Sequence, residues 1–159
     1  MAAKVKAVPE GYHTLTAYIA VDDAAGAIDF YQRAFGARER SRMEAEDGRI
    51  AHAALEIGDS VLMLSDTSSD EVRPPLALGG TTTSMFMYVD DVDAVFDQAV
   101  SEGATVSAEV ADQFWGDRFG TLTDPYGHHW SIATHIEDLT PEELGDRARD
   151  VLVAVGGRR

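Results

Sequence analysis

Residues 13–36, HTLTAYIAVDDAAGAIDFYQRAFG, hold the pattern that decides the fold. The first nine residues are rich in β-branched and aromatic side chains, which predicts a strand. Asp22 and Asp23 then predict a helix cap, because a short carboxylate accepts the free N–H groups of the first turn. Apolar residues follow at helical spacing as far as Phe35. Gly36 predicts the end of the helix, since glycine adopts the left-handed conformation there without steric cost.

The same pattern recurs further along the chain, so the sequence contains an internal repeat. Val21-Asp22-Asp23 matches Val89-Asp90-Asp91 at an offset of 68 residues, and a helix-ending Gly-Ala pair recurs at an offset of 67. Each half therefore predicts one strand, one helix and three further strands. Module one is expected over 14–65 with later strands near 38–45, 49–57 and 60–65, and module two over 82–137 with strands near 82–89, 105–112, 117–123 and 129–135.

The repeat also indicates how the domain is organised. A polar linker rich in Pro and Gly separates the modules over 66–81, and a helix and tail are expected over 139–159. The helix begins with a capping box, Thr140-Pro141-Glu142-Glu143. We expect an α+β fold in which two tandem βαβββ modules pair into a concave mixed sheet around a cleft, as one domain over 1–138. The C-terminal helix would dock on this domain or on a partner through an apolar stripe of Leu144, Ala148, Val151, Leu152 and Val155.

Composition excludes several classes of function. The chain has 159 residues, a formal charge of −15 and no cysteine. Its charge argues against nucleic acid and anionic membrane surfaces as partners, but it permits a cationic ligand. The missing cysteines exclude disulfides, thiolate metal sites and a cysteine nucleophile. Since no apolar leader or membrane-length apolar run is visible, we expect a cytoplasmic protein.

Several short motifs, duplicated and in order, give the chain a resemblance to a known superfamily. They are Val21-Asp22-Asp23, Ala27-Ile28-Asp29-Phe30-Tyr31, Phe35-Gly36, Val89-Asp90-Asp91-Val92-Asp93-Ala94 and Asp124-Pro125-Tyr126-Gly127-His128, within which the stretch 112–135 is the most specific. Over residues 14–138 the chain resembles the vicinal oxygen chelate superfamily, which includes glyoxalase I, extradiol dioxygenases, and fosfomycin- and bleomycin-resistance proteins. It is most similar to the PhnB-like, glyoxalase-like branch.

The resemblance locates four positions at which metal-dependent members carry ligands. In this sequence they are Thr16, Leu62 or Met63, Ser84 and Ser131, and none is His, Asp or Glu. A divalent ion needs imidazole or carboxylate donors there while keeping positions open for substrate. We therefore expect no metal site of the family type and no cofactor. A new site built from His52 and His129 stays an alternative, although no histidine pair has a recognised ligand spacing.

Strand alternation predicts which side chains line the cleft. The first strand would contribute Thr16 and Tyr18, the fifth strand Ser84, Phe86 and Tyr88, and the last strand Ser131. Small hydroxyls combined with aromatic rings suit a neutral or mildly polar organic ligand. The alternative is that these residues simply pack as core.

Residues 113–118, QFWGDR, are the most distinctive chemically. Gln113 and Trp115 are predicted to bind ligand, and Arg118 could clamp an anion with two parallel hydrogen bonds. Asp117 or His52 could transfer a proton. Alternatively, Asp117 and Arg118 form a pair that pins a hairpin while Trp115 covers the edge of the core.

These residues lead to three functional hypotheses. The first is a metal-independent protein that binds a small organic molecule, either as a binding protein alone or as an isomerase or lyase. The second is a resistance protein that sequesters a bulky cationic antibiotic. The third, a metal-dependent lactoylglutathione lyase, is disfavoured by the four missing ligands. The resemblance further implies a homodimer whose ligand clefts lie between the subunits.

Overall fold

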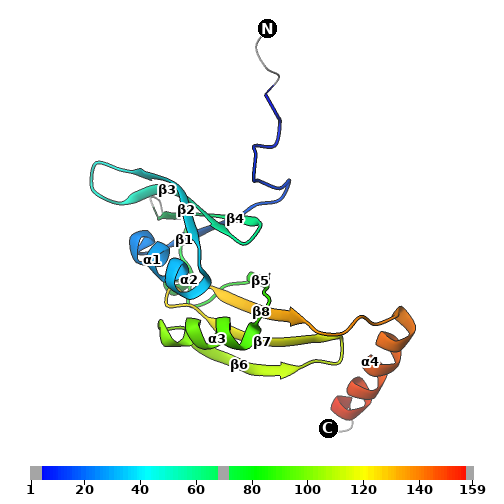
Figure 1. Ribbon diagram of the computed structural model, residues 1–159. Coiled ribbons are helices and arrows are strands. Elements are labelled where there is room, and N and C mark those ends of the chain that lie inside the picture. Colours follow the sequence, from blue (N-terminus) through cyan, green and yellow to red (C-terminus); the bar gives the residue numbers. More distant parts are fainter. Residues whose placement is uncertain (1–4, 68–71, 157–159) are drawn as a thin grey trace.

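The computed structural model describes residues 5–67 and 72–156. Module one consists of β1 (Ala17–Val21), α1 (Ala24–Phe35), β2 (Arg38–Glu44), β3 (Ile50–Ile57) and β4 (Ser60–Asp66). Module two consists of β5 (Ser84–Tyr88), α3 (Val92–Ser101), β6 (Thr105–Asp112), β7 (Asp117–Thr123) and β8 (His129–His135). A short helix, α2 (Pro75–Leu78), lies in the linker, and α4 (Pro141–Gly156) follows the second module (Figure 1).

Both long helices of the repeat begin and end where the sequence predicted. The carboxylate of Asp23 accepts a hydrogen bond from the Gly26 N–H at 2.9 Å, and Asp91 accepts one from Ala94 N–H at 3.0 Å. Gly36 closes α1 with a φ of 64°, the left-handed conformation that favours glycine. The duplicated Asp-Asp pair is therefore a duplicated helix start.

Each module forms its own four-stranded mixed sheet. Sheet A has the order β1-β4-β3-β2 and sheet B the order β5-β8-β7-β6. The β1–β4 and β5–β8 pairs are parallel, and the other neighbours are antiparallel. The two tandem βαβββ modules are thus confirmed. In the described residues no strand of sheet A is hydrogen-bonded to a strand of sheet B, so β1 and β5 are free edges.

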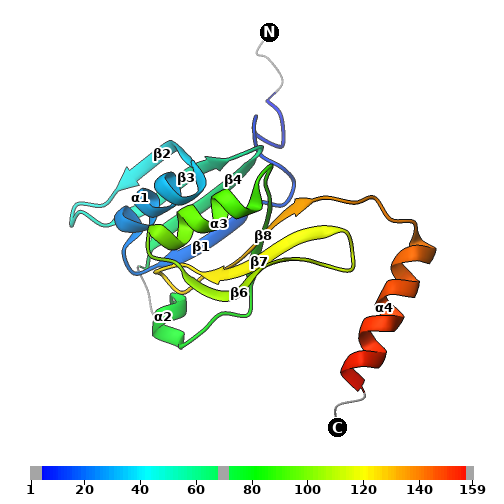
Figure 2. The ribbon, with the colours of Figure 1, turned by 60° about the horizontal axis from the view of Figure 1, so that its bottom comes forward.

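One apolar core holds the modules together. Helices α1 and α3 pack against each other, and each also covers one face of its own sheet (Figures 1 and 2). Phe30 and Tyr31 of α1 share this core with Leu122, Trp130 and Ile132 of sheet B. The Tyr31 and Trp130 ring centroids are 5.4 Å apart. Because the helices cover only one face of each sheet, the opposite faces stay open.

The turn between β7 and β8 ties the modules further through Asp124, which is 4% exposed. Its Oδ2 accepts hydrogen bonds from the Tyr31 hydroxyl at 2.7 Å and from Trp130 Nε1 at 2.8 Å. Its Oδ1 accepts the backbone N–H groups of Tyr126 and His128, both at 2.9 Å. Burial, followed by the neighbouring Asp124 charge, raises the pKa of Tyr31 well above its usual value. The hydroxyl therefore remains a donor to the carboxylate.

Helix α4 leaves sheet B along a defined path. The N–H groups of Ile136 and Glu137 both donate to Gly116 O, at 2.9 and 3.0 Å. The predicted capping box is present, since Thr140 N–H donates to Glu143 Oε2 at 2.8 Å and Glu143 N–H donates to Thr140 Oγ1 at 3.3 Å. In Figures 1 and 2 the helix stands apart from both sheets.

The apolar stripe of α4 has no packing surface on the described part of its own chain. Leu144 and Val151 are 38% and 39% exposed. The side chains of Leu152 and Val155, which complete the predicted stripe, lie outside the described part. Docking of this helix stays a prediction. None of the described helices is both long and apolar enough to span a bilayer.

Candidate functional site

The open face of sheet B carries the side chains that alternation placed in the cleft. On β5, Ser84, Phe86 and Tyr88 point away from the core, and Phe86 and Tyr88 are 52% and 62% exposed. Ser131 of β8 lies on the same face, with its Oγ 3.3 Å from Ser84 Oγ. Large exposed aromatic side chains gathered on one surface are typical of a binding site.

Four rings form a continuous surface, here called the aromatic face: Phe86, Tyr88, Trp115 and Phe119. The Phe86 centroid lies 5.1 Å from that of Tyr88 and 5.6 Å from that of Phe119, with Phe86 and Phe119 stacked at 19°. Trp115 meets Phe119 edge-on, with centroids 5.6 Å apart. Three separate parts of module two therefore build one surface: β5, the β6–β7 hairpin and β7.

Asp117 holds the aromatic face in place. The residue is 3% exposed, and its Oδ2 accepts hydrogen bonds from the Tyr88 hydroxyl at 2.9 Å and Trp115 Nε1 at 3.0 Å. Its Oδ1 contacts His135 Nδ1 at 2.8 Å. Burial alone would raise the pKa of Asp117, but hydrogen bonds from His135, Tyr88 and Trp115 outweigh it and lower that pKa. The carboxylate stays ionised and fixes two rings from different parts of the sheet.

His135 is a site residue that the sequence predictions did not include. Its Nε2 lies 3.0 Å from Asp138 Oδ1, so each ring nitrogen faces a carboxylate. Hydrogen bonds to Asp117 and then Asp138 raise the pKa of His135. The ring borders a hollow of about 470 Å³ whose other walls are Tyr88, Val89, Asp90 and Thr134. Strand alternation puts His135 on the same face as Ser131, four residues earlier, but its pairing with Asp117 follows from the β7–β8 register.

The open face of sheet A carries a second, smaller group. The Tyr18 hydroxyl lies 3.3 Å from His52 Nδ1, the two ring centroids are 5.6 Å apart, and Tyr18 is 51% exposed. Thr16 precedes β1 and donates its hydroxyl to His13 O at 3.2 Å. No described hydrogen bond or ring contact joins Tyr18 or His52 to the aromatic face.

Arg118 lies on the side of sheet B that α3 covers. Its Nε and Nη2 donate to the two carboxylate oxygens of Asp93 on α3, at 2.6 and 2.7 Å, and its Nη1 donates to Asp112 at 2.9 Å. Both carboxylates, Asp93 first, raise the pKa of Arg118. Gln113 donates to Ala111 O at 3.1 Å, within the β6–β7 hairpin. The structure therefore does not bring Arg118 together with the aromatic face, and its neighbour Asp117 faces the other way.

The four family ligand positions do not fit a divalent metal ion. Thr16, Ser84 and Ser131 offer neutral hydroxyls, and Leu62 and Met63 offer no oxygen or imidazole donor. Elsewhere in 5–67 and 72–156, no three His, Cys, Asp or Glu side chains gather in a way that could hold a metal. His52 belongs to sheet A and His129 to sheet B.

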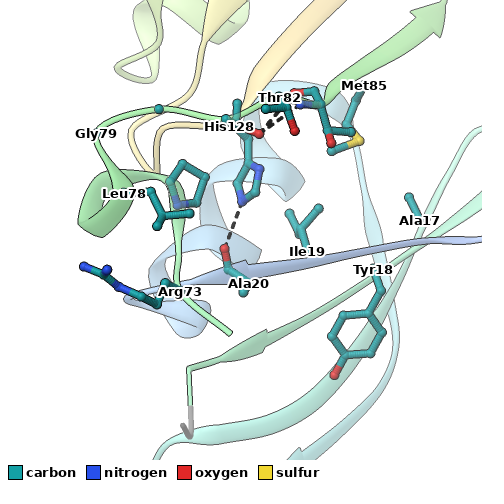
Figure 3. A pocket seen from close by; sticks show the side chains of 14 residues that line it. Ala17, Tyr18, Ile19, Ala20, Arg73, Leu78, Gly79, Thr82, Met85 and His128 are labelled. Atoms are coloured by element: carbon teal, nitrogen blue, oxygen red, sulfur yellow. Dashed lines mark hydrogen bonds between the residues drawn. The ribbon is translucent and has the colours of Figure 1, made fainter. Parts of the chain in front are cut away.

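A separate cavity of about 660 Å³, here called the linker pocket, lies between the modules (Figure 3). Its walls come from β1, from the linker with α2, from the start of β5 and from His128. The lining residues are Ala17, Tyr18, Ile19, Ala20, Arg73, Pro75, Leu78, Gly79, Gly80, Thr81, Thr82, Thr83, Met85 and His128. The Tyr18 ring points away from His128 in Figure 3.

Comparison with known proteins identifies the family. The model of the Glyoxalase/Bleomycin resistance protein/Dioxygenase superfamily matches residues 12–132. This chain belongs to that superfamily.

Relatives and solved structures extend the comparison. Uncharacterized protein Mb0911c of Mycobacterium bovis and uncharacterized protein Rv0887c of Mycobacterium tuberculosis are each 42% identical over 134 residues, covering 82% of this chain and 88% and 79% of theirs. The crystal structure of TioX from Micromonospora sp. ML1 is 29% identical, covers 80% of this chain and 100% of its own, and has a TM-score of 0.62. A PhnB protein from Bacillus cereus, 18% identical over 77% of this chain and 99% of its own with a TM-score of 0.61, shares the fold.

Proposed function

We propose that this protein binds a small, planar organic molecule on the aromatic face without a metal ion. The observation that carries the proposal is an aromatic face in which two of the four rings, Tyr88 and Trp115, are hydrogen-bonded to one buried carboxylate. Tyr88 and Trp115 are both anchored on Asp117, so little side-chain freedom is lost when a ligand stacks on them. Stacking on such rings provides apolar contact area and a preferred geometry.

Asp117 is better suited to anchoring than to chemistry. Its oxygens already accept three hydrogen bonds and its pKa is lowered, so it is a poor proton acceptor. An isomerase or lyase activity would therefore depend on His52, as the sequence suggests, or on His135. Binding is the function that the aromatic face supports directly.

We further propose that the ligand site is completed by a second copy of the chain. Each protomer leaves the open faces of sheets A and B uncovered and the strands β1 and β5 unpaired at one edge. In a homodimer, the Tyr18 and His52 face of one protomer can lie over the aromatic face of the other. This arrangement supports a cleft between subunits and explains why the two groups do not meet within a chain.

One observation favours a cationic ligand and hence the antibiotic-binding alternative. The chain carries a net charge of −15, and Arg118, which could have received an anion, is held by two carboxylates on the other side of sheet B. The negative electrostatic potential of such a chain favours the binding of cations over anions of the same shape. Sequestration of a cationic aromatic antibiotic is therefore the second candidate function.

The test compares three planar probes of similar size: neutral 2-naphthol, the N-methylquinolinium cation and the 2-naphthoate anion. Trp115 lies on the aromatic face, whereas Trp130 is buried, so bound probes should quench the fluorescence of Trp115. We expect the neutral and cationic probes to bind and the anion to bind at least about tenfold more weakly. If the cationic probe binds clearly more tightly than the neutral probe, the result would favour the antibiotic-binding alternative.

Variants locate the binding. Phe86→Ala and Tyr88→Ala should each weaken binding about tenfold or more, because each removes a stacking surface. Val100→Ala removes an exposed apolar side chain from α3 and should leave probe binding unchanged. Arg118→Ala should also leave binding intact, whereas a loss of 2-naphthoate binding in that variant would restore Arg118 as an anion anchor. Equal binding of all probes by Phe86→Ala and the parent protein would refute the proposal.

A further inference from the structure

His128, which lines the linker pocket, carries a buried polar atom that has no partner among the described residues. His128 is 6% exposed, and its Nδ1 makes no hydrogen bond to any described residue. The other ring nitrogen, Nε2, lies 2.9 Å from the carbonyl oxygen of Ala20 on β1 (Figure 3). Nearly all buried polar groups in folded proteins are hydrogen-bonded, so an orphan of this kind calls for an explanation.

The contact with Ala20 fixes what Nδ1 can do. A carbonyl oxygen only accepts, so Nε2 must carry the proton that joins them. A second proton on Nδ1 would create a buried N–H group with no acceptor among the described residues, because the nearby Asp124 carboxylate receives the backbone N–H of His128 and not its ring. With the ring proton on Nε2, Nδ1 presents a lone pair that needs a donor.

The surroundings of His128 indicate the kind of molecule that would supply the donor. Ile19, Leu78 and Met85 give the pocket apolar walls, and Arg73 lies at the linker side. An ammonium group would lose its hydration against these walls and would meet the Arg73 charge, while a carboxylate would point its own lone pairs at Nδ1. A neutral O–H or N–H group on an apolar body avoids both penalties.

We propose that the linker pocket is a second ligand site, which takes a small uncharged molecule whose hydroxyl or amide-type N–H donates to His128 Nδ1. The walls come from β1, the linker, the start of β5 and His128, and none of the four rings of the aromatic face lines this pocket. Binding at His128 involves no residue of the aromatic face, so this proposal stands independently of binding there.

The test uses phenol and its methyl ether, anisole, as a matched pair that differs in the donor. Titrations are followed by NMR through the backbone amides of Ile19, Thr82 and Met85 and through the imidazole ¹⁵N resonances of His128. We expect Nδ1 to be unprotonated in the free protein. Phenol should bind saturably and shift the Nδ1 resonance, and anisole should bind at least about tenfold more weakly.

Four variants separate binding in this pocket from other causes. His128→Phe should abolish the preference for phenol over anisole, while His129→Phe, a change at the exposed neighbouring histidine, should preserve it. His128→Phe also removes the contact with Ala20 and could disturb folding. A further variant, Leu78→Trp, therefore fills the pocket from an exposed position and leaves His128 itself unchanged. It should block phenol, whereas Phe86→Ala should not.

Several results would overturn the proposal. They are a protonated Nδ1 in the free protein, equal affinities for phenol and anisole, no saturable phenol binding at the pocket, or a high-resolution structure in which a water or a second protomer alone occupies the space beside Nδ1.

Discussion

Asp117 and Asp124 are both buried carboxylates, yet their partners give them different roles. Asp117 joins Tyr88, Trp115 and His135 beneath an exposed surface, whereas Asp124 joins Tyr31 and Trp130 inside the core between the modules. The first therefore positions a surface for binding, and the second links two halves of the chain. Their exposed fractions, 3% and 4%, do not distinguish them.

We predict that Asp124→Asn lowers the free energy of unfolding by about 3 kcal/mol or more. The amide fits the space, but one of its two ends cannot accept, so buried donors from Tyr31, Trp130 or the turn lose their partner, at about 1–3 kcal/mol each. Chemical denaturation of the two proteins at neutral pH measures the change.

Two further variants control this measurement. Tyr31→Phe removes a single donor and should cost about 1 kcal/mol. Asp97→Asn changes an exposed aspartate on α3 and should stay within about 0.5 kcal/mol of the parent protein. If Asp124→Asn were as stable as Asp97→Asn, the hydrogen bonds of Asp124 would not stabilise the contact between the modules.

Single residues also show where prediction from sequence reaches its limit. Phe86 and Tyr88 could be placed on the open face from strand alternation, since their side chains lie two residues apart. By the same rule Asp117 and Arg118, as neighbours in one strand, cannot share a face, which argues against grouping them in one cleft. His135 could be assigned to the correct face, but its pairing with Asp117 required the register between β7 and β8.

At the scale of elements, the β6–β7 hairpin depends on Gly116. This residue has a φ of 97°, and a Cβ placed on it would collide with the carbonyl oxygen of Glu137. Its own carbonyl accepts the N–H groups of Ile136 and Glu137. The hairpin and the segment leading to α4 are therefore in backbone contact, where only glycine fits.

We predict that Gly116→Ala destabilises the protein clearly more than Gly58→Ala. Gly58 also has a positive φ, 58°, but a Cβ there meets nothing within 4 Å, so its replacement should cost about 1–2 kcal/mol from backbone strain alone. Gly116→Ala adds the collision and displaces Trp115 and Asp117 on either side.

Thermal unfolding and probe binding measure the two effects. Gly116→Ala should have the lower midpoint and should lose affinity for 2-naphthol, whereas Gly58→Ala should bind it normally. Equal midpoints for the two variants would show that the hairpin tolerates a shift away from Glu137.

The elements themselves were largely predictable. The Asp caps and the glycine stops are local signals, and the predicted helices and strands agree with the structure within a few residues at their ends. Helix α2 was missed within the predicted linker, because a single turn of four residues gives no periodic pattern. The separation of the sheets was also beyond local signals, since it depends on α1 packing against α3.

For the whole molecule, the open faces lead to a prediction about association. A monomer would leave Tyr18, Phe86 and Tyr88 more than half exposed on two sheets. We expect sedimentation equilibrium to give twice the mass of one chain. Because each chain carries −15 charges, the dimer should dissociate more readily at low ionic strength, where repulsion is less screened.

Charge placed on the open faces tests this arrangement. Tyr18→Glu and Phe86→Glu should each shift the protein toward monomer, while Val100→Glu, on α3, should leave the dimer intact. A parent protein that stays monomeric at all salt and protein concentrations would contradict the expected dimer and the shared cleft.

The hydrogen bonds between the modules at the β7–β8 turn also show how the two copies of the repeat have diverged. Tyr31 and Ala20 belong to the first copy, and Asp124 and His128, which bind them, belong to the second. Where the second copy has Gly127-His128, the first has Gly58-Asp59, so the two copies are no longer interchangeable at this turn. Either copy alone would leave polar groups without the hydrogen-bond partners that the other copy provides. The duplicated halves have therefore become mutually dependent, and the chain should melt in a single cooperative transition.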